Sequence, residues 1–313
     1  MSLASLPLEA ERRDFLGATD VAAILGLSPY RAPIDVWRRK MGLDDGEPGT
    51  ERMRLGQILE QAIADAYSEQ TGRQLRRVRE VRHPRHPFLV GHPDRLIVGE
   101  RGVFEAKASA STRGYTVPSG AGLGDERLDV PPSVRVQAIW YTGLTDRDWT
   151  DVVLLAHMGL HTIRVPHDAE LYDDLVSAAV DWWQRHIVGR EEPPPDGSDG
   201  YRRHLAERFP RDSGEELVAT PEQTLLADEL RSAVADAKAA EERKAGIENR
   251  LRAAMGEATR LIGPGFAFTW RAQKGRTAWK ELAAELGATE EQIAAHTPPG
   301  PRVFRASFTE GED

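Results

Sequence analysis

The sequence contains no cysteine among its 313 residues. This absence excludes disulfides, cysteine-ligated zinc and cysteine-ligated iron–sulfur clusters. The sequence also has no apolar run of about 18 residues, the length that a membrane-spanning helix needs. Residues 1–15 lack the basic start and apolar stretch of a secretory signal. We therefore expect a cytoplasmic protein with no membrane partner.

Net positive charge is lacking as well, since the formal net charge is −9. Taken alone, this value argues against a nucleic-acid partner, but the distribution of charge matters more than the sum. Residues 73–86 hold six arginines and one acid, Glu80. Such a basic stripe either binds a phosphate backbone or forms a solvated, arginine-rich pair of strands. Under the first alternative, Arg76 and Arg79 are candidate DNA contacts.

The Pro/Gly/Asp cluster at 191–200 divides the chain. We expect a mixed α/β domain over 1–190, a linker over 191–219, and a long helix with a small α/β tail over 220–313. A Gly/Pro-rich stretch at 117–132 interrupts the first domain. The hydrophobic periodicity predicts helices at 18–25, 33–41, 52–70, 133–142 and 168–187, and strands at 74–82, 88–98, 102–107, 149–156 and 161–165. Beyond the linker it predicts a helical arm at 220–255, a strand at 265–271, a helix at 279–286 and a strand at 302–308.

One segment, residues 86–109, combines the residue types of a hydrolytic metal site. Asp94 falls within a predicted strand, and Glu105 and Lys107 share one face of the next strand because they are two residues apart. Two carboxylates suit Mg²⁺ or Mn²⁺, and the Ala106 carbonyl could add a third oxygen ligand. Lys107 could position the attacking water and offset charge in the transition state. The same letters also fit a surface hairpin with a salt bridge.

Other candidates lie on neighbouring elements. Glu60 could reach the metal site from the helix before the sheet, or could be an ordinary exposed glutamate. Gln137 and Tyr141, four residues apart, share a helical face directed at the sheet. Thr19 and Ser28 flank an apolar helix, for which a plain capped helix is the alternative. Zinc is not favoured, because no fourth ligand accompanies three clustered histidines, His83, His86 and His92.

Five segments occur in the order found in a known family: GATDVAAILGLSPYRAPIDVWRRKMGL, MRLGQILEQAIADAYSEQTGR, HPFLVGHPDRLI, FEAKAS and VRVQAIWYTG. From Gly17 to Ile187 the chain resembles the YqaJ-like viral recombinase family, relatives of the lambda-type phage exonuclease. The resemblance implies a restriction-endonuclease-like PD-(D/E)XK nuclease domain with a central mixed sheet flanked by helices. It also implies roles for the candidate residues: Asp94 and Glu105 bind metal, Lys107 is catalytic, Glu60 is an auxiliary acid and Gln137 is the motif glutamine.

The resemblance further implies a metal-dependent exonuclease that degrades linear duplex DNA from an end, 5′ to 3′, in phage-type recombination. Thr19 and Ser28 would then lie near the DNA end, and Tyr141 is a further candidate DNA contact. The implied partners are a single-strand annealing protein and further copies of the chain in a ring. Arg95 follows Asp94 where a small residue is common, and either contacts phosphate or points outward. The alternatives are an endonuclease on the same fold and a catalytically silent DNA-binding module.

Overall fold

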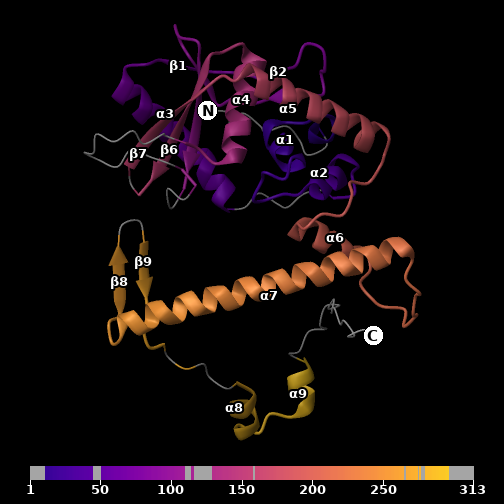
Figure 1. Cartoon of the computed structure of the whole chain (residues 1–313). Coiled ribbons are helices and arrows are strands. Elements are labelled where there is room, and N and C mark those ends of the chain that lie inside the picture. The colour runs from indigo at the N-terminus through magenta and orange to yellow at the C-terminus, as the bar shows by residue number, and fades with distance from the viewer. Residues whose placement is uncertain are drawn as a thin grey trace. The chain divides into compact units, whose positions relative to one another are not determined.

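A computed structural model describes residues 11–44, 51–109, 114–115, 129–157, 159–263, 266–273, 275 and 279–295 (Figure 1). The chain separates into two compact units, Met1–Glu207 and Arg208–Asp313. Among the described residues, no helix combines the length and apolarity needed to cross a membrane. The predicted terminal strand at 302–308 and most of the Gly/Pro-rich stretch lie outside the described residues.

The first unit is built on a five-stranded sheet with the order β1-β4-β5-β6-β7. All neighbours are antiparallel except β5 and β6, which run parallel. A parallel pair needs a crossover connection, and this one contains helix α4. The bounds are β1 (Leu75–Arg77), β4 (Arg95–Ile97), β5 (Gly102–Ala108), α4 (Pro132–Thr145), β6 (Trp149–Ala156) and β7 (Gly159–Pro166).

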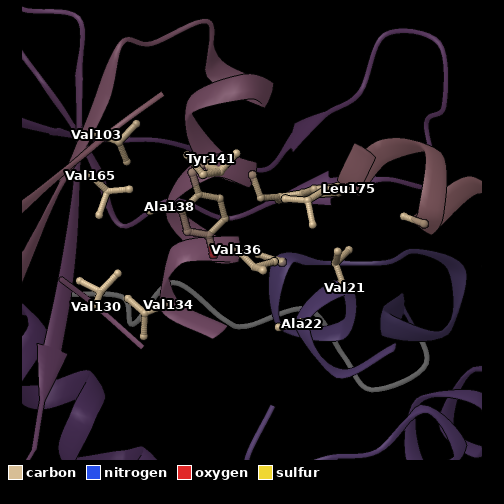
Figure 2. Close-up of a cluster of buried hydrophobic side chains, with 14 of the residues drawn as sticks. Val21, Ala22, Val103, Val130, Val134, Val136, Ala138, Tyr141, Val165 and Leu175 are labelled. Atoms are coloured by element: carbon tan, nitrogen blue, oxygen red, sulfur yellow. The ribbon is translucent and has the colours of Figure 1, made fainter. Parts of the chain in front are cut away.

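Helices cover both faces of this sheet. Alternate residues of β5 point in opposite directions, so Phe104 packs beneath α3 while Val103 packs with α4. Figure 2 shows the hydrophobic cluster on the α4 side of the sheet, in which Val103 and Val165 from the sheet meet Ala138 and Tyr141 of α4. The mixed α/β class with a central mixed sheet flanked by helices is thus confirmed. The remaining helices of this core are α1 (Ala18–Ile24), α2 (Pro33–Lys40), α3 (Glu51–Thr71) and α5 (Ala169–Trp182), with a 3-10 turn at Glu11–Asp14.

Two long predicted strands are each broken in the structure. The range 74–82 contains β1 and β2 (Val81–Arg82), and the range 88–98 contains β3 (Val90–Gly91) and β4. Strands β2 and β3 pair with each other in a separate ribbon, and the Val90 N–H of β3 also donates to the Leu16 carbonyl at 2.9 Å. Pro93 lies in the second break, and proline has no N–H to donate to a ladder. Asp94 therefore lies immediately before β4, whereas the sequence predicted it inside a strand.

The predicted linker contains a helix that packs on the first unit. Helix α5 continues into a π-helical turn (Trp183–Val188), an extended segment follows, and α6 spans Asp199–Arg208. Tyr201 of α6 is buried against Ile34 and Trp37 of α2, and Arg203 donates to Asp35 at 3.0 Å. The compact unit consequently extends past residue 190 to Glu207. The sequence showed no helical periodicity here because the buried residues of α6 are Gly200, Tyr201 and His204, which do not form an apolar stripe.

The second unit begins with the long predicted helix, α7 (Pro221–Met255). Thr220 caps it, since its Oγ1 accepts from the Gln223 N–H at 3.3 Å and Gln223 Oε1 accepts from the Thr220 N–H at 2.9 Å. A hairpin of β8 (Arg260–Gly263) and β9 (Phe266–Thr269) follows, and the sequence predicted only its second strand. Two short helices, α8 (Trp279–Glu285) and α9 (Glu290–Ala295), complete the described part of this unit.

Candidate active site

The hairpin of β4 and β5 brings Asp94 beside Glu105. Residue pairs Leu96↔Val103 and Arg95↔Phe104 define the register, so the next pair along the hairpin is Asp94 with Glu105. Asp94 Oδ2 accepts a hydrogen bond from the Ala106 N–H at 2.8 Å, which fixes the carboxylate against β5. The side chain of Ala106 packs toward α3, as the alternation predicted. The two carboxylates therefore converge where the antiparallel and parallel parts of the sheet meet.

A chain of side-chain hydrogen bonds leads from Glu105 into α4. Lys107 Nζ donates to Glu105 Oε1 and to Gln137 Oε1, both at 2.7 Å. Gln137 Nε2 in turn donates to the Tyr141 hydroxyl at 3.1 Å. The predicted helical face of Gln137 and Tyr141 thus does point at the sheet. Tyr141 is buried, and this burial argues against the DNA contact expected for it.

Helix α4 approaches the strand before the site very closely. The Trp140 indole N–H donates to the Val90 carbonyl at 2.9 Å. A Cβ at Gly91 would lie 2.7 Å from Leu144 Cδ1, so only glycine fits there without displacement. This contact holds the segment that leads into Asp94 against the helix that carries Gln137.

Burial raises the pKa of Asp94 well above its ordinary value, and the negative charges of Glu105 and Glu60 raise it further. Burial likewise raises the pKa of Glu105, although Lys107 opposes this effect. Burial alone would lower the pKa of Lys107, but the charges of Glu105 and Asp94 outweigh it, so this pKa is raised. Lys107 therefore carries a positive charge, which acts on both the Asp94 and the Glu105 carboxylate.

Glu60 and Arg95 lie on the α3 side of the sheet and form an ion pair. Arg95 Nη1 contacts Glu60 Oε1 at 2.6 Å, and Arg95 Nη2 donates to Gln61 Oε1 at 3.0 Å. Arg95 is only 3% exposed, so its burial argues against the predicted phosphate contact and against the outward orientation. Glu60 is near enough to raise the pKa of Asp94, as its predicted auxiliary position requires, but one of its oxygens is occupied by Arg95.

The acidic side chains of the site outnumber its cations. Three carboxylates (Asp94, Glu105 and Glu60) face two cations, Lys107 and Arg95. Glu105 Oε2 is buried and has no hydrogen-bond partner within the described residues. A buried carboxylate oxygen without a donor is costly, and a cation would satisfy it. The donor set thus fits a hard divalent cation held by Asp94 and Glu105.

No three side chains of His, Asp or Glu converge as a metal site within the described part of the chain. His83 is buried and its Nδ1 accepts from the backbone N–H groups of Arg85 (3.2 Å) and His86 (3.1 Å).

The predicted DNA-contact residues lie at different depths. Arg76 and Arg79 are exposed and form no ion pair within the described residues. Thr19 is exposed on α1, whereas Ser28 Oγ accepts from the N–H groups of Tyr30 (3.2 Å) and Arg31 (3.3 Å) and shapes a turn. DNA contact by these four residues stays a prediction.

Tyr115 was not predicted as part of the site. It packs against the core cluster that includes α4, burial raises its pKa, and the charge of Lys107 opposes that rise. Tyr115 lies just before the Gly/Pro-rich stretch at 117–132, where no periodicity marks a side chain as facing inward. The sequence signal that could have identified Tyr115 as an inward-facing residue was a single tyrosine whose neighbours in the sequence lack large apolar side chains.

A mixed sheet that places Asp94 before a strand, and Glu105 and Lys107 on the next, defines the PD-(D/E)XK class of core. Residues 9–148 match the family described as the YqaJ-like viral recombinase domain. This match covers less than half of the chain and confirms the resemblance seen in the sequence.

Three individual proteins that resemble this chain share less than 30% sequence identity with it. The protein YqaJ of Bacillus subtilis (strain 168) is 27% identical over 204 residues, which cover 64% of this chain and 61% of YqaJ. The chain thus spans less than two thirds of that relative. An alkaline exonuclease from Laribacter hongkongensis, solved with dAMP, is 17% identical with a TM-score of 0.47 over 64% of this chain and 96% of that one. A phage-related exonuclease from Haemophilus somnus 129PT is 14% identical with a TM-score of 0.43 over 56% of this chain and 96% of that one.

Proposed function

We propose that this protein is a divalent-metal-dependent DNA exonuclease that hydrolyses linear duplex DNA from an end, with 5′ to 3′ polarity, in recombination. The observation that carries the proposal concerns Glu105, beside Asp94 and Lys107: its Oε2 is buried and accepts no hydrogen bond from the part of the chain that the structure describes. Buried side-chain oxygens in folded proteins usually accept at least one hydrogen bond. A buried carboxylate oxygen that accepts none is available to a cation.

The residues have separate tasks under this proposal. Asp94 and Glu105 would hold Mg²⁺ or Mn²⁺, with the Ala106 carbonyl as a possible third ligand and Glu60 beside it. The bound ion would lower the pKa of water and neutralise charge on phosphate. Gln137 and Glu105 orient Lys107 Nζ from two sides, because both accept its hydrogen bonds at 2.7 Å. The ammonium would then stabilise negative charge that develops on the phosphate.

Tyr141 supports this arrangement from the interior. Burial raises its pKa well above the ordinary value, so its hydroxyl stays neutral. That hydroxyl accepts from Gln137 Nε2, which leaves Gln137 Oε1 directed at Lys107. Arg76 and Arg79 are proposed to contact the DNA backbone. An annealing protein that receives the exposed strand, and a ring of copies, are proposed partners.

The experiment tests the wild-type protein and the Lys107→Ala variant. Each is given linear duplex DNA labelled at either 5′ end or either 3′ end, together with closed circular DNA. Both proteins are incubated with Mg²⁺, with Mn²⁺ and with EDTA. Arg101→Gln serves as a matched surface control, since Arg101 is exposed and pairs only with exposed Asp146 and Asp148 in the described structure.

We expect digestion of linear DNA only, early release of the 5′ label, and loss of activity with EDTA and in Lys107→Ala. Cleavage of the closed circle would replace the exonuclease with an endonuclease on the same fold. Folded wild-type protein that binds DNA but never cleaves it with either metal would refute the nuclease and favour a silent binding module.

A further inference from the structure

Helix α7 has an apolar stripe with a strict seven-residue repeat. Core positions alternate at spacings of four and three residues, which is the repeat of a two-stranded coiled coil. Of these side chains, Leu226 is 62% exposed, Leu230 37% and Ile247 45%. We name this set the α7 stripe: Leu226, Leu230, Ala233, Ala237, Ala240, Lys244, Ile247, Leu251 and Ala254.

Four charged residues flank the stripe at intervals of seven. Each precedes a core position by one residue, and their order along the helix is acid, acid, base, base. All four are exposed, and none forms an ion pair within the described residues. Six other charges of the helix form three ion pairs along it: Arg231 with Asp228, Lys244 with Glu241, and Arg252 with Glu248, the last at 2.7 Å. We name these four the flanking charges: Glu229, Asp236, Arg243 and Arg250.

We infer that the α7 stripe binds the α7 stripe of a second copy of this chain in antiparallel orientation. In an antiparallel pair, the flanking position of one helix runs beside the same flanking position of the other. The order acid, acid, base, base then places Glu229 opposite Arg250 of the second copy and Asp236 opposite its Arg243. The two-fold axis generates each pair twice.

The same register matches the core positions by size. Leu226 meets Leu251 of the second copy, and Leu230 meets its Ile247. Ala237 meets Ala240 beside the axis, where small residues let the helices approach closely. Lys244 meets Ala233, whose small side chain leaves room for the aliphatic stem of the lysine while the ammonium reaches solvent.

Other arrangements of two copies are disfavoured by charge. In a parallel pair, Lys244 faces its own counterpart at the core, and Asp236 lies beside Glu241 of the second copy. Shifting the antiparallel register by one heptad places Arg243 opposite Arg243. Like charges directly opposite each other destabilise both alternatives. Only one of these arrangements therefore pairs every flanking charge with its opposite.

The test measures the mass of the full chain in solution by sedimentation. We expect the wild type to associate through α7 into a species of at least two copies, and the charge reversals Glu229→Arg/Asp236→Arg and Arg243→Glu/Arg250→Glu each to lose this association. Mixing the two variants in equal amounts should restore it, because every flanking pair becomes opposite in charge again. Circular dichroism of each variant checks that the helix remains folded.

Orientation has its own readout, because the chain has no cysteine of its own. An oxidised mixture of Ala233→Cys and Lys244→Cys should form a disulfide-linked dimer, whereas neither variant should do so alone. A monomeric wild type would overturn the inference. So would reversal variants that keep the wild-type mass, or a cross-link that each cysteine variant forms with itself.

Discussion

Replacing Asp94 by asparagine should make the metal-free protein more stable while abolishing its response to metal. The substitution keeps the shape and the acceptor for the Ala106 N–H, which Asp94 Oδ2 binds at 2.8 Å. It removes the charge whose pKa is raised by burial, by Glu105 and by Glu60. The change thus isolates the electrostatic cost of the site from its packing.

The sign follows from proton linkage. The folded pKa of Asp94 lies above its ordinary value of 3.8, so the folded state binds the proton more tightly than the unfolded state. The free energy of unfolding therefore falls as the pH rises from 3.8 through the folded pKa, and the cost is fully present above that window. The stabilisation by Asp94→Asn should be largest at pH 8 and shrink as the pH is lowered toward 3.8.

The magnitude is about 1.4 kcal/mol for each unit by which the pKa is raised. For a chain of this size, each kcal/mol corresponds to about 2–4 °C in Tm. Metal acts in the opposite direction, because a ligand at 100 times its Kd stabilises the folded state by about 2.7 kcal/mol. Wild type should therefore gain about 5–10 °C from saturating Mg²⁺ or Mn²⁺, and the variant should gain nothing.

Thermal unfolding is measured for wild type and Asp94→Asn at several pH values, with EDTA or with metal. Asp181→Asn on α5 is the matched control, since Asp181 is exposed and its charge has no ion-pair partner within the described residues. An Asp94→Asn variant less stable than wild type at pH 8 in EDTA would refute the reasoning. It would mean that the carboxylate already has a compensating partner.

Three further predictions concern the chemistry, the basic stripe and the scaffold. Lys107→Met should lower kcat by about 10²–10³-fold with little change in DNA affinity, because the ammonium acts on charge in the transition state; single-turnover cleavage and binding assays check this, and an active variant would contradict it. Replacing Arg76 and Arg79 by alanine should flatten the salt dependence of DNA binding by about one unit of slope for each phosphate that is no longer neutralised; an unchanged slope would make the stripe structural. Asp151→Asn should lower the free energy of unfolding by about 3 kcal/mol, since fully buried Asp151 accepts hydrogen bonds from Arg164 at 2.7 and 2.9 Å. Urea unfolding measures this change, and a loss below about 1 kcal/mol would show that hydration stabilises the Arg164 guanidinium about as well as its ion pair with Asp151 does.

Elements with a strong repeat were predictable from the sequence. Strand β6 has the predicted bounds, and β5 and α4 differ from prediction by only a few residues at their ends. Strand alternation was enough to place Glu105 and Lys107 on one face and Ala106 on the other. Helix spacing was enough to join Gln137 to Tyr141. The centre of the site could therefore be assembled from local geometry alone.

The breaks and the pairings could not be obtained in this way. A run such as 88–98 looks continuous because its residue types suit a strand, and only the effect of Pro93 on the ladder divides it. Helix α6 depends on burial of Tyr201 against α2, which lies more than 160 residues earlier in the chain. Long-range packing of this kind leaves no periodic trace in the sequence.

Arg95 shows why the composition of a site does not give its charge balance. In the sequence, Arg95 beside Asp94 looks like a cation that would neutralise it. Asp94 lies just before β4 and is fixed to Ala106 of β5, whereas Arg95 lies over Phe104 on the α3 side and pairs with Glu60 at 2.6 Å. The nearest cation in the sequence thus pairs with another acid, Glu60, and within the described residues Lys107 is the cation that acts on both Asp94 and Glu105. Any role of Glu60 as a metal ligand must therefore compete with Arg95, so Arg95→Met should strengthen metal binding if Glu60 is a ligand and leave it unchanged if Glu60 is not.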